Sequence, residues 1–254
     1  MRKLIWFLIL VIFPIAGYSQ QSHKCLSNDQ TPEEIIKACT SGINDPKVTK
    51  KDQAWFAIRA GGISQFDKKD ASTVVGFFLI AVEKGRLDGY AWIGDLYREG
   101  YGSIKIDYKR ANDYYDLDTT YSSTKLRGLG EMYREGKGQD QNFYAAAVHF
   151  MWALEKSEES FDAMTLCDIY ADNANPLRNL IIAETYCRIA VKLMDHAGLK
   201  GNFEVRRIRI ADQLTPTQQE QSRRQFERCV VLKYSLMCHE LSELDRLPVP
   251  PRSN

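Results

Sequence analysis

Apolar and small residues recur at helical spacing through the centre of the chain and predict paired helices. A block with the sequence AWIGDLYREGYG, residues 91–102, returns 36 residues later as RGLGEMYREGKG, residues 127–138. Because the offset holds beyond the block, the whole unit repeats, and each unit should contain two helices. The matching second-helix positions are Ala111, Tyr114 and Tyr115 in one copy and Ala147, Phe150 and Met151 in the next.

Glycines mark the end of each first helix and its contact with the second. The motif Tyr-Arg-Glu-Gly-x-Gly closes the first helix twice, with a glycine that can adopt the left-handed conformation. Gly94 and Gly130 lie within the first helices, and their lack of a side chain would let the partner helix, presenting Ala111 or Ala147, come close.

A third, degraded copy extends from Phe161 to Gly198. Cys167 occupies the small position and Tyr170 the tyrosine position. The Gly-x-Gly loop is replaced by residues 172–176, DNANP, where asparagine tolerates a left-handed turn and proline starts the next segment. Upstream, residues 54–62 and 72–85 form a more divergent pair, so four helix pairs are expected in all.

These motifs carry a family resemblance. Gly94-x-x-Tyr97-x-x-Gly100-x-Gly102 with the following Ala-x-x-Tyr-Tyr resembles the Sel-one-like repeat (SLR), a 36-residue relative of the tetratricopeptide repeat. The resemblance covers residues 88–198, and residues 33–87 resemble the tetratricopeptide-type pair that often precedes such arrays. It implies an all-α solenoid of stacked antiparallel helix pairs that acts as an adaptor or scaffold, with no reaction and no cofactor.

Helix-start signals define the two ends of the array. Thr31-Pro32-Glu33-Glu34 and Thr215-Pro216-Thr217-Gln218 each combine a threonine cap, a proline at the first helical position and an acid or amide three residues after the cap. The second helix is expected to run to about His239 and to close the array. The expected segments are a signal peptide (1–19), an N-terminal helix (20–50), a divergent tetratricopeptide-like pair (51–87), two Sel-one-like repeats (88–124 and 125–160), a degenerate repeat (161–198) and a C-terminal cap with its tail (199–254).

The first residues predict export. Two basic residues precede an apolar run from Leu4 to Ala16, and small residues follow, which is the order of a secretory signal cleaved after Ser19. A membrane anchor is the alternative, but the run is shorter than the ~20 residues that span a bilayer and contains Pro14. We therefore expect a periplasmic or secreted protein with no stable membrane anchor after signal cleavage.

Charge argues against a nucleic-acid partner. The chain has 34 basic and 33 acidic residues, and removal of the signal leaves it slightly acidic. No basic block is long enough to follow a phosphate backbone.

Six cysteines remain after signal cleavage, an even number that favours disulfides in an exported chain. Cys167 and Cys187 fall on facing helices of the third copy and form the leading pair, and Cys25 is expected to fold back to Cys39 across the first cap. Cys229 and Cys238 would lie about 13 Å apart in an unbroken helix, beyond the reach of a disulfide. Either that helix breaks or these two cysteines pair differently.

Catalytic and metal-binding patterns are weak. Ser122 and Lys125 have the Ser-x-x-Lys spacing of penicillin-recognising serine enzymes, but the companion Lys-Thr-Gly and Ser-Asp-Asn motifs are missing. No two of the four histidines have the i, i+4 spacing of a helical metal site, and there is no Cys-x-x-Cys pair. We expect neither an enzyme nor a metal site.

The candidate site is a row of charged residues on the first helices. In this repeat class, the residues just after the small position and one turn further on line the concave face. One interpretation is that these charges only form i, i+3 pairs on a solvated face. The other is that the row, mostly acidic with regularly spaced arginines, binds a partner bearing basic side chains. The residues are Asp95, Arg98, Glu99, Arg127, Glu131, Arg134, Glu135, Asp168 and Asp172.

The sequence thus favours an exported scaffold that captures another protein. A specific form, implied by the resemblance, is an immunity protein that neutralises an effector delivered by a type VI secretion system. The alternatives are a hydrolase of cell-wall or β-lactam substrates and a purely structural envelope protein.

Overall fold

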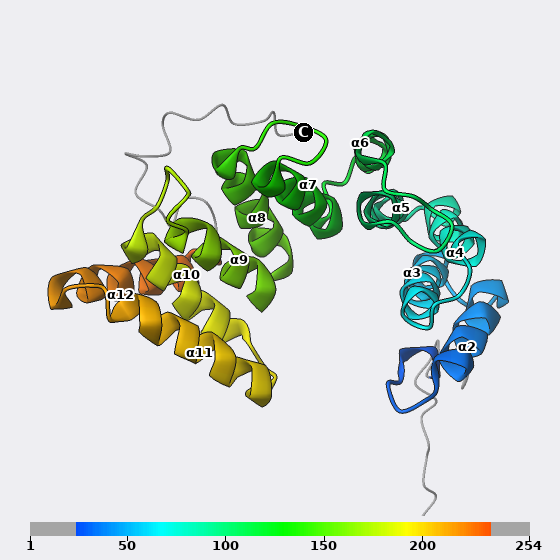
Figure 1. Ribbon diagram of the computed structural model, residues 1–254. Helices are drawn as coiled ribbons and strands as arrows, with labels where there is room; N and C mark the ends of the chain where they lie inside the picture. Colours follow the sequence, from blue (N-terminus) through cyan, green and yellow to red (C-terminus); the bar gives the residue numbers. More distant parts are fainter. Residues whose placement is uncertain (1–23, 235–254) are drawn as a thin grey trace, which may run out of the picture. The chain divides into compact units, whose positions relative to one another are not determined.

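The computed structural model describes residues 24–234, and every named element in that range is a helix (Figure 1). The expected signal peptide, Cys238 and His239 lie outside the described residues. The helices are α2 (Pro32–Asn44), α3 (Lys50–Phe66), α4 (Ala71–Glu83), α5 (Asp88–Glu99), α6 (Tyr108–Leu117), α7 (Ser123–Glu135), α8 (Phe143–Ser157), α9 (Ser160–Ala171), α10 (Leu180–Leu193), α11 (Ala197–Ala211) and α12 (Pro216–Val231).

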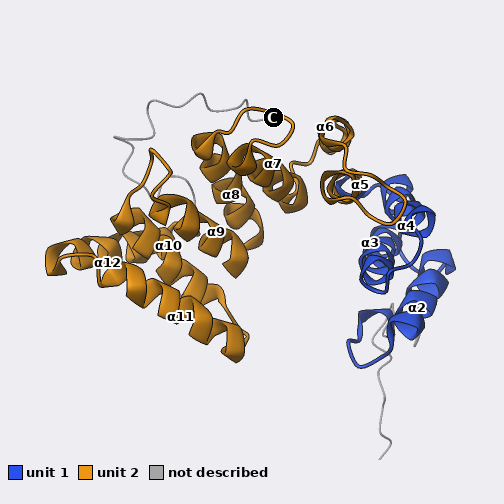
Figure 2. Ribbon diagram, in the orientation of Figure 1, with its two compact units in different colours: residues 1–89 blue, residues 90–254 orange. Residues whose placement is uncertain are grey.

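The chain divides into two compact units, Met1–Gly89 and Tyr90–Asn254 (Figure 2). In unit 1, α3 packs against α2 and α4. In unit 2, α7 packs with α8 and α9 with α10, and α8 also contacts α9. Helix pairs that follow one another in sequence therefore stack on their neighbours within each unit, which is the α-solenoid architecture expected from the repeat.

Unit 1 is closed at its start by a cap and a disulfide. Thr31 and Glu34 form the expected capping box at the N-terminus of α2. Cys25 and Cys39 form a disulfide with their Cα atoms 4.7 Å apart, as expected from the sequence. Arg59 of α3 donates to the carbonyl oxygens of Cys25 and Ser27, so the segment before α2 is tied to the next helix as well.

One backbone hydrogen bond recurs in all three copies of the repeat. The residue that caps the second helix donates its N–H to the carbonyl oxygen of the tyrosine that recurs in each first helix, over 2.8 to 2.9 Å. This bond fixes the return of the chain at the same point of each pair, and the third copy shares it with the other two. The bonded pairs are Asp107 with Tyr97, Asn142 with Tyr133, and Asn179 with Tyr170.

The small position of the first helices receives an aromatic ring. A Cβ atom added to Gly94 would lie 2.6 Å from Cε1 of Tyr115 and 3.2 Å from the carbonyl oxygen of Ala111. One added to Gly130 would lie 2.9 Å from the ring of Phe150. The close approach was expected, but the main contact is a ring of the second helix, because the alanines leave space that the aromatic side chains fill.

The loop of the third copy differs from its prediction. Gly100 and Gly136 adopt positive φ as expected, but no asparagine of residues 172–176 does. Instead, the buried side chain of Asn175 donates to the Ile169 carbonyl oxygen at 2.6 Å and accepts from the Leu177 N–H at 2.9 Å. The Asn175 side chain therefore forms the hydrogen bonds that end α9, whereas a glycine in the left-handed conformation ends the first helix in the other two copies.

The C-terminal cap contains two helices where the sequence predicted one. The unexpected helix is α11, and both α11 and α12 pack on α10. Thr215 starts α12 with the expected capping box, but the helix ends at Val231 and does not continue to His239. Lys233 and Tyr234 then adopt positive φ, which L-residues take only outside helices. The helix therefore ends between Cys229 and Cys238, and the unbroken helix that would have held these two cysteines too far apart for a disulfide is not formed.

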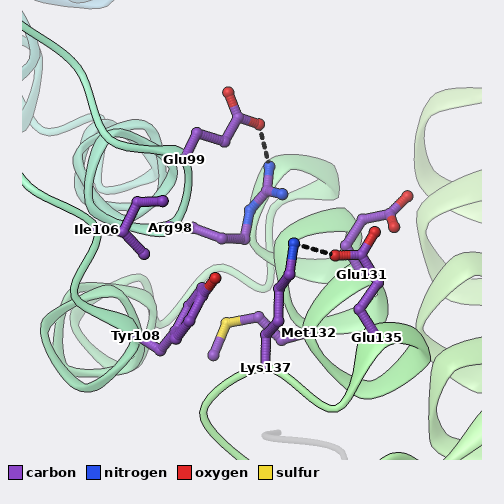
Figure 3. Close-up of a pocket in the computed structure, with 8 residues that line it drawn as sticks. All are labelled: Arg98, Glu99, Ile106, Tyr108, Glu131, Met132, Glu135 and Lys137. Atoms are coloured by element: carbon purple, nitrogen blue, oxygen red, sulfur yellow. Dashed lines mark hydrogen bonds and ion pairs between the residues drawn. The ribbon is translucent and has the colours of Figure 1, made fainter.

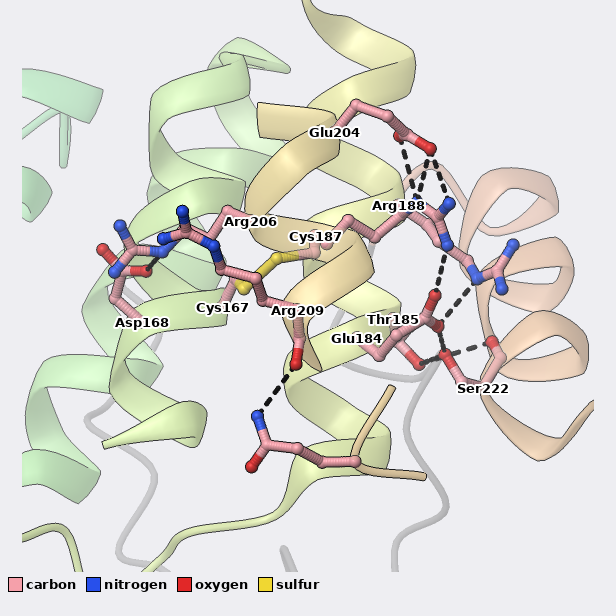
Figure 4. The surroundings of a disulfide bond; sticks show 12 residues. Cys167, Asp168, Glu184, Thr185, Cys187, Arg188, Glu204, Arg206, Arg209 and Ser222 are labelled. Carbon is pink, nitrogen blue, oxygen red and sulfur yellow. Dashed lines mark hydrogen bonds and ion pairs between the residues drawn. A yellow bond between two sulfur atoms is a disulfide. The ribbon is translucent and has the colours of Figure 1, made fainter. Parts of the chain in front are cut away.

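A disulfide and a buried ion cluster hold this end of unit 2 together (Figure 4). Cys167 of α9 and Cys187 of α10 form the expected disulfide, with Cα atoms 5.2 Å apart. Nearby, the fully buried carboxylate of Glu184 accepts from Arg188 at 2.7 Å and from Arg207 of α11 at 3.0 Å, and Ser222 of α12 also donates to it. One carboxylate therefore joins three helices, because a buried charge is stable only when it is paired.

Candidate functional site

The predicted charged row lies on the first helices of unit 2. Asp95, Arg98 and Glu99 are on α5, Asp168 is on α9, and the four residues between them in sequence are on α7. Their surroundings show which of these charges are engaged within the chain and which are open to a partner.

On α5, Asp95 is held by a buried tyrosine. The hydroxyl of Tyr115 donates to Asp95 Oδ1 at 2.6 Å, and Arg98 Nε donates to the same oxygen at 3.1 Å. Burial raises the pKa of Asp95 above its ordinary value of 3.8, although Arg98 and the Tyr115 hydroxyl favour the charged form. Arg98 also pairs with Glu99 at 2.5 Å. The Arg98 side chain is only 18% exposed, so its orientation is fixed.

On α7, the equivalent residues form the equivalent pair. Arg134 contacts Glu131 at 2.6 Å, and Glu135 contacts Lys137 at 2.5 Å. Burial raises the pKa of Glu131, which is 24% exposed, against the opposing charges of Arg134 and, from the preceding repeat, Arg98. The i, i+3 pairs proposed as the simpler interpretation are therefore present on both helices.

Arg127 and Asp172 have structural roles. Arg127 donates through Nε and Nη2 to both carboxylate oxygens of Asp162, at 2.6 and 2.7 Å, and to Ser157. Asp162 is only 2% exposed, so this bidentate pair joins α7 to α9 inside the structure. Asp172 caps the C-terminus of α9 and accepts from the Ala174 N–H at 2.9 Å, which is a turn contact. Asp172 lies one turn after Asp168 and lines neither of the two hollows described below.

At the far end of the row, Asp168 pairs with a residue that the sequence did not single out. Arg206 of α11 contacts Asp168 at 2.6 Å (Figure 4). Burial raises the pKa of Asp168, and Arg206 and Arg134 oppose that shift. Because α11 was not expected, this cation was missed, and the row alternates in sign more regularly than its sequence suggested.

Two hollows open along the row and share Arg98 and Glu131. The α5–α7 hollow has a volume of about 230 Å³. Figure 3 shows the ring of Tyr108 and the apolar side chains of Ile106 and Met132 among its charged side chains. Its lining is Arg98, Glu99, Ile106, Tyr108, Glu131, Met132, Glu135 and Lys137.

The α7–α9 hollow is larger, at about 410 Å³. It combines charged groups with two phenylalanine rings, of which Phe161 was not recognised from the sequence. Its lining is Arg98, Arg127, Glu131, Phe150, Glu159, Phe161, Asp162 and Thr165. The row therefore offers mixed polar and apolar depressions, a composition suited to side chains of another protein.

The Ser-x-x-Lys pattern has a structural role. Ser122 caps α7 by accepting from the Lys125 N–H at 3.2 Å. The Lys125 ammonium is buried, donates to the Asp118 carbonyl oxygen at 3.1 Å and lies 4.6 Å from the ring centroid of Tyr121. Both side chains thus fix the start of α7.

Other chemistry finds little support in the described part of the chain. His149 contacts the Ala145 carbonyl oxygen at 2.8 Å, and burial lowers its pKa. Within residues 24–234, no group of three or more His, Cys, Asp or Glu side chains is placed to hold a metal ion. None of the described helices combines the length and the apolar character of a membrane span.

Two solved structures are similar to this chain. One is a protective antigen present in uropathogenic Escherichia coli strains that displays an SLR fold. It aligns over 88% of this chain and 57% of its own, with 14% identity and a TM-score of 0.41. The other, a Sel1 repeat protein from Oxalobacter formigenes, aligns over 63% of this chain and 64% of its own, with 19% identity and a TM-score of 0.48. This chain therefore spans less than two thirds of either protein. No family model and no curated protein matches the sequence.

Proposed function

We propose that this protein is an exported binding protein that captures a partner protein on the charged row of unit 2. The observation that carries the proposal is the pair of adjacent hollows, which share Arg98 and Glu131 and are lined by half-buried charges and apolar side chains. Such pre-arranged mixtures of apolar and charged groups are typical of protein interfaces.

The charges of the two hollows favour a partner with basic side chains. In each hollow, three carboxylates face two cations. Most of these groups are paired with each other, so the partner does not meet a strong field. It meets polar groups held in place by their neighbours, which gives specificity more than affinity.

Export is supported by the signal-like N-terminal sequence and by two disulfides, since disulfides persist in oxidising compartments. The finer form of the proposal is an immunity protein that binds a type VI secretion effector in the periplasm. It predicts that co-expression protects cells from an effector encoded beside the gene.

An exchange of two charges tests the proposal. The variant Glu131→Arg/Arg134→Glu retains an ion pair within α7 but reverses the charge at position 131, which lines both hollows. We expect affinity capture of the partner from the envelope to fall by about tenfold or more, with an unchanged far-UV circular dichroism spectrum.

The matched control exchanges a second-helix pair. Lys109 and Asp113 form an exposed i, i+4 ion pair on α6 at 2.9 Å, and neither lines a hollow. Lys109→Asp/Asp113→Lys should capture the partner as the wild type does. Equal capture by both exchanged variants, or equal loss, would refute the charged row as the binding surface.

A further inference from the structure

The α7–α9 hollow contains an aromatic ring that the fold leaves open. Phe161, in the first turn of α9, is 56% exposed although its ring packs edge-on against Phe203 at 5.5 Å between centroids. Phe150 is buried on the other side of the hollow. An exposed phenylalanine beside a recess is a feature of contact surfaces, because its burial by a partner gives a large apolar gain.

Nearly every charge of this hollow has a partner of its own. Arg127 is neutralised by Asp162, Arg98 by Asp95 and Glu99, and Glu131 by Arg134. These ion pairs span 2.5 to 3.1 Å.

Glu159 is the exception. It stands at the N-cap of α9, but its side chain makes no capping hydrogen bond, and no cation of residues 24–234 lies within ion-pair distance of it. Its carboxylate is exposed at the edge of the hollow, two residues before Phe161. Arg127 is the nearby cation on which Glu159 acts, but its guanidinium forms its ion pair with Asp162. The hollow therefore has one carboxylate without an ion-pair partner beside one exposed ring.

We propose that the α7–α9 hollow binds an arginine side chain of the partner protein, with its guanidinium group on Glu159 and its planar face over Phe161. The proposal rests on the proposed function and specifies the partner's chemistry. Arginine fits better than lysine because a planar guanidinium stacks on aromatic rings and donates two parallel hydrogen bonds to a carboxylate. An apolar side chain would leave Glu159 unpaired, and an acidic one would be repelled.

An NMR titration with a single amino-acid derivative tests this directly. We would add N-acetyl-arginine methylamide to the ¹⁵N-labelled, oxidised mature protein and follow the backbone amide signals. Shifts should concentrate at Phe161, Asp162 and Thr165. The lysine derivative should bind about threefold more weakly, and the leucine and glutamate derivatives should leave these signals unchanged.

Two variants and two controls complete the test. Glu159→Gln and Phe161→Ala should each weaken arginine binding by about threefold. Glu158→Gln changes the adjacent exposed carboxylate, which lies outside the hollow, and Phe66→Ala removes an exposed ring of unit 1. Both controls should titrate like the wild type.

The proposal is overturned if the arginine derivative shifts no signal of the hollow, or if the lysine or leucine derivative binds as tightly as the arginine derivative. It is also overturned if Glu158→Gln weakens arginine binding as much as Glu159→Gln does. The proposed function has a separate readout. A protein that fails this titration but loses partner capture on exchange of Glu131 and Arg134 would still be a binding protein of another chemistry.

Discussion

At the scale of single residues, Tyr115 links the core of the repeat to the charged row. Its ring lies against Gly94 and its hydroxyl holds Asp95. A Cβ atom on Gly128 would overlap the same hydroxyl, so the next repeat also leaves room for it. Gly128 stands where the preceding copy has Trp92. The glycines therefore position a hydroxyl that orients the carboxylate of the site.

Gly94→Ala tests this arrangement. The added methyl group would meet both the Tyr115 ring and the Ala111 carbonyl oxygen, and a buried ring cannot move away freely. We expect urea denaturation to show a loss of about 1–3 kcal/mol in the free energy of unfolding. Gly201→Ala is the control, because nothing lies within 4 Å of its added methyl group, and it should stabilise α11 by roughly 0.5–1 kcal/mol. Equal effects of the two changes would contradict this account.

Glu131 gives a second prediction, on pH. Burial raises its pKa above 4.5, so the folded protein holds this proton to a higher pH than the unfolded chain does. The stability that Glu131 contributes is therefore present at low pH and is lost as pH rises through the folded-state pKa. The unfolding free energy of the wild type minus that of Glu131→Gln should fall as pH is raised from 4.5.

Glu220→Gln is the control of opposite sign. Hydrogen bonds from Arg223 and Arg224 lower the pKa of Glu220 to about 2. Its contribution is therefore present above pH 4.5 and is lost as pH falls toward 2. Urea denaturation over a pH series measures both variants. A difference for Glu131→Gln that stays constant or rises with pH would contradict the buried position of this carboxyl.

At the scale of elements, the third copy shows how the loop between the paired helices forms without the Gly-x-Gly motif. Asn175 makes with its side chain the hydrogen bonds that end α9. Asn175→Ala leaves the Ile169 carbonyl oxygen and the Leu177 N–H without these partners, and we expect a loss of about 1–3 kcal/mol in the free energy of unfolding. Asn173→Ala, at an exposed position of the same loop, should change it by no more than about 0.5 kcal/mol. Thermal unfolding of both variants distinguishes this side-chain cap from a loop with no specific role.

The helix pairs from α5 to α10 follow from the sequence because two near-identical copies define the period, and the third aligns with them. The helix α11 does not follow, because it begins with Gly198 and Gly201 among polar residues and matches no part of the repeat. The capping box at Thr215 shows where α12 starts. Its end could not be predicted, since no glycine or proline marks it.

At the scale of the whole molecule, the repeat period identified the helices that carry the charged row but not the partners of its charges. Helical spacing within one helix predicts two of the ion pairs, Asp95–Arg98 and Glu131–Arg134. The other two ion pairs, Arg127–Asp162 and Asp168–Arg206, depend on which helices face each other, and α11 was not predicted. The α7–α9 hollow was missed for the same reason, because four different helices, α5, α7, α8 and α9, and the cap before α9 contribute to it.

Site-specific photo-cross-linking in the native envelope tests the central claim most directly. A photoreactive phenylalanine analogue at Phe161 occupies the α7–α9 hollow with little change of shape, and the same analogue at Val231, 80% exposed on α12, is the control. The account predicts that one partner polypeptide is cross-linked from position 161 and not from position 231. No cross-link from position 161, or the same products from both positions, would contradict it.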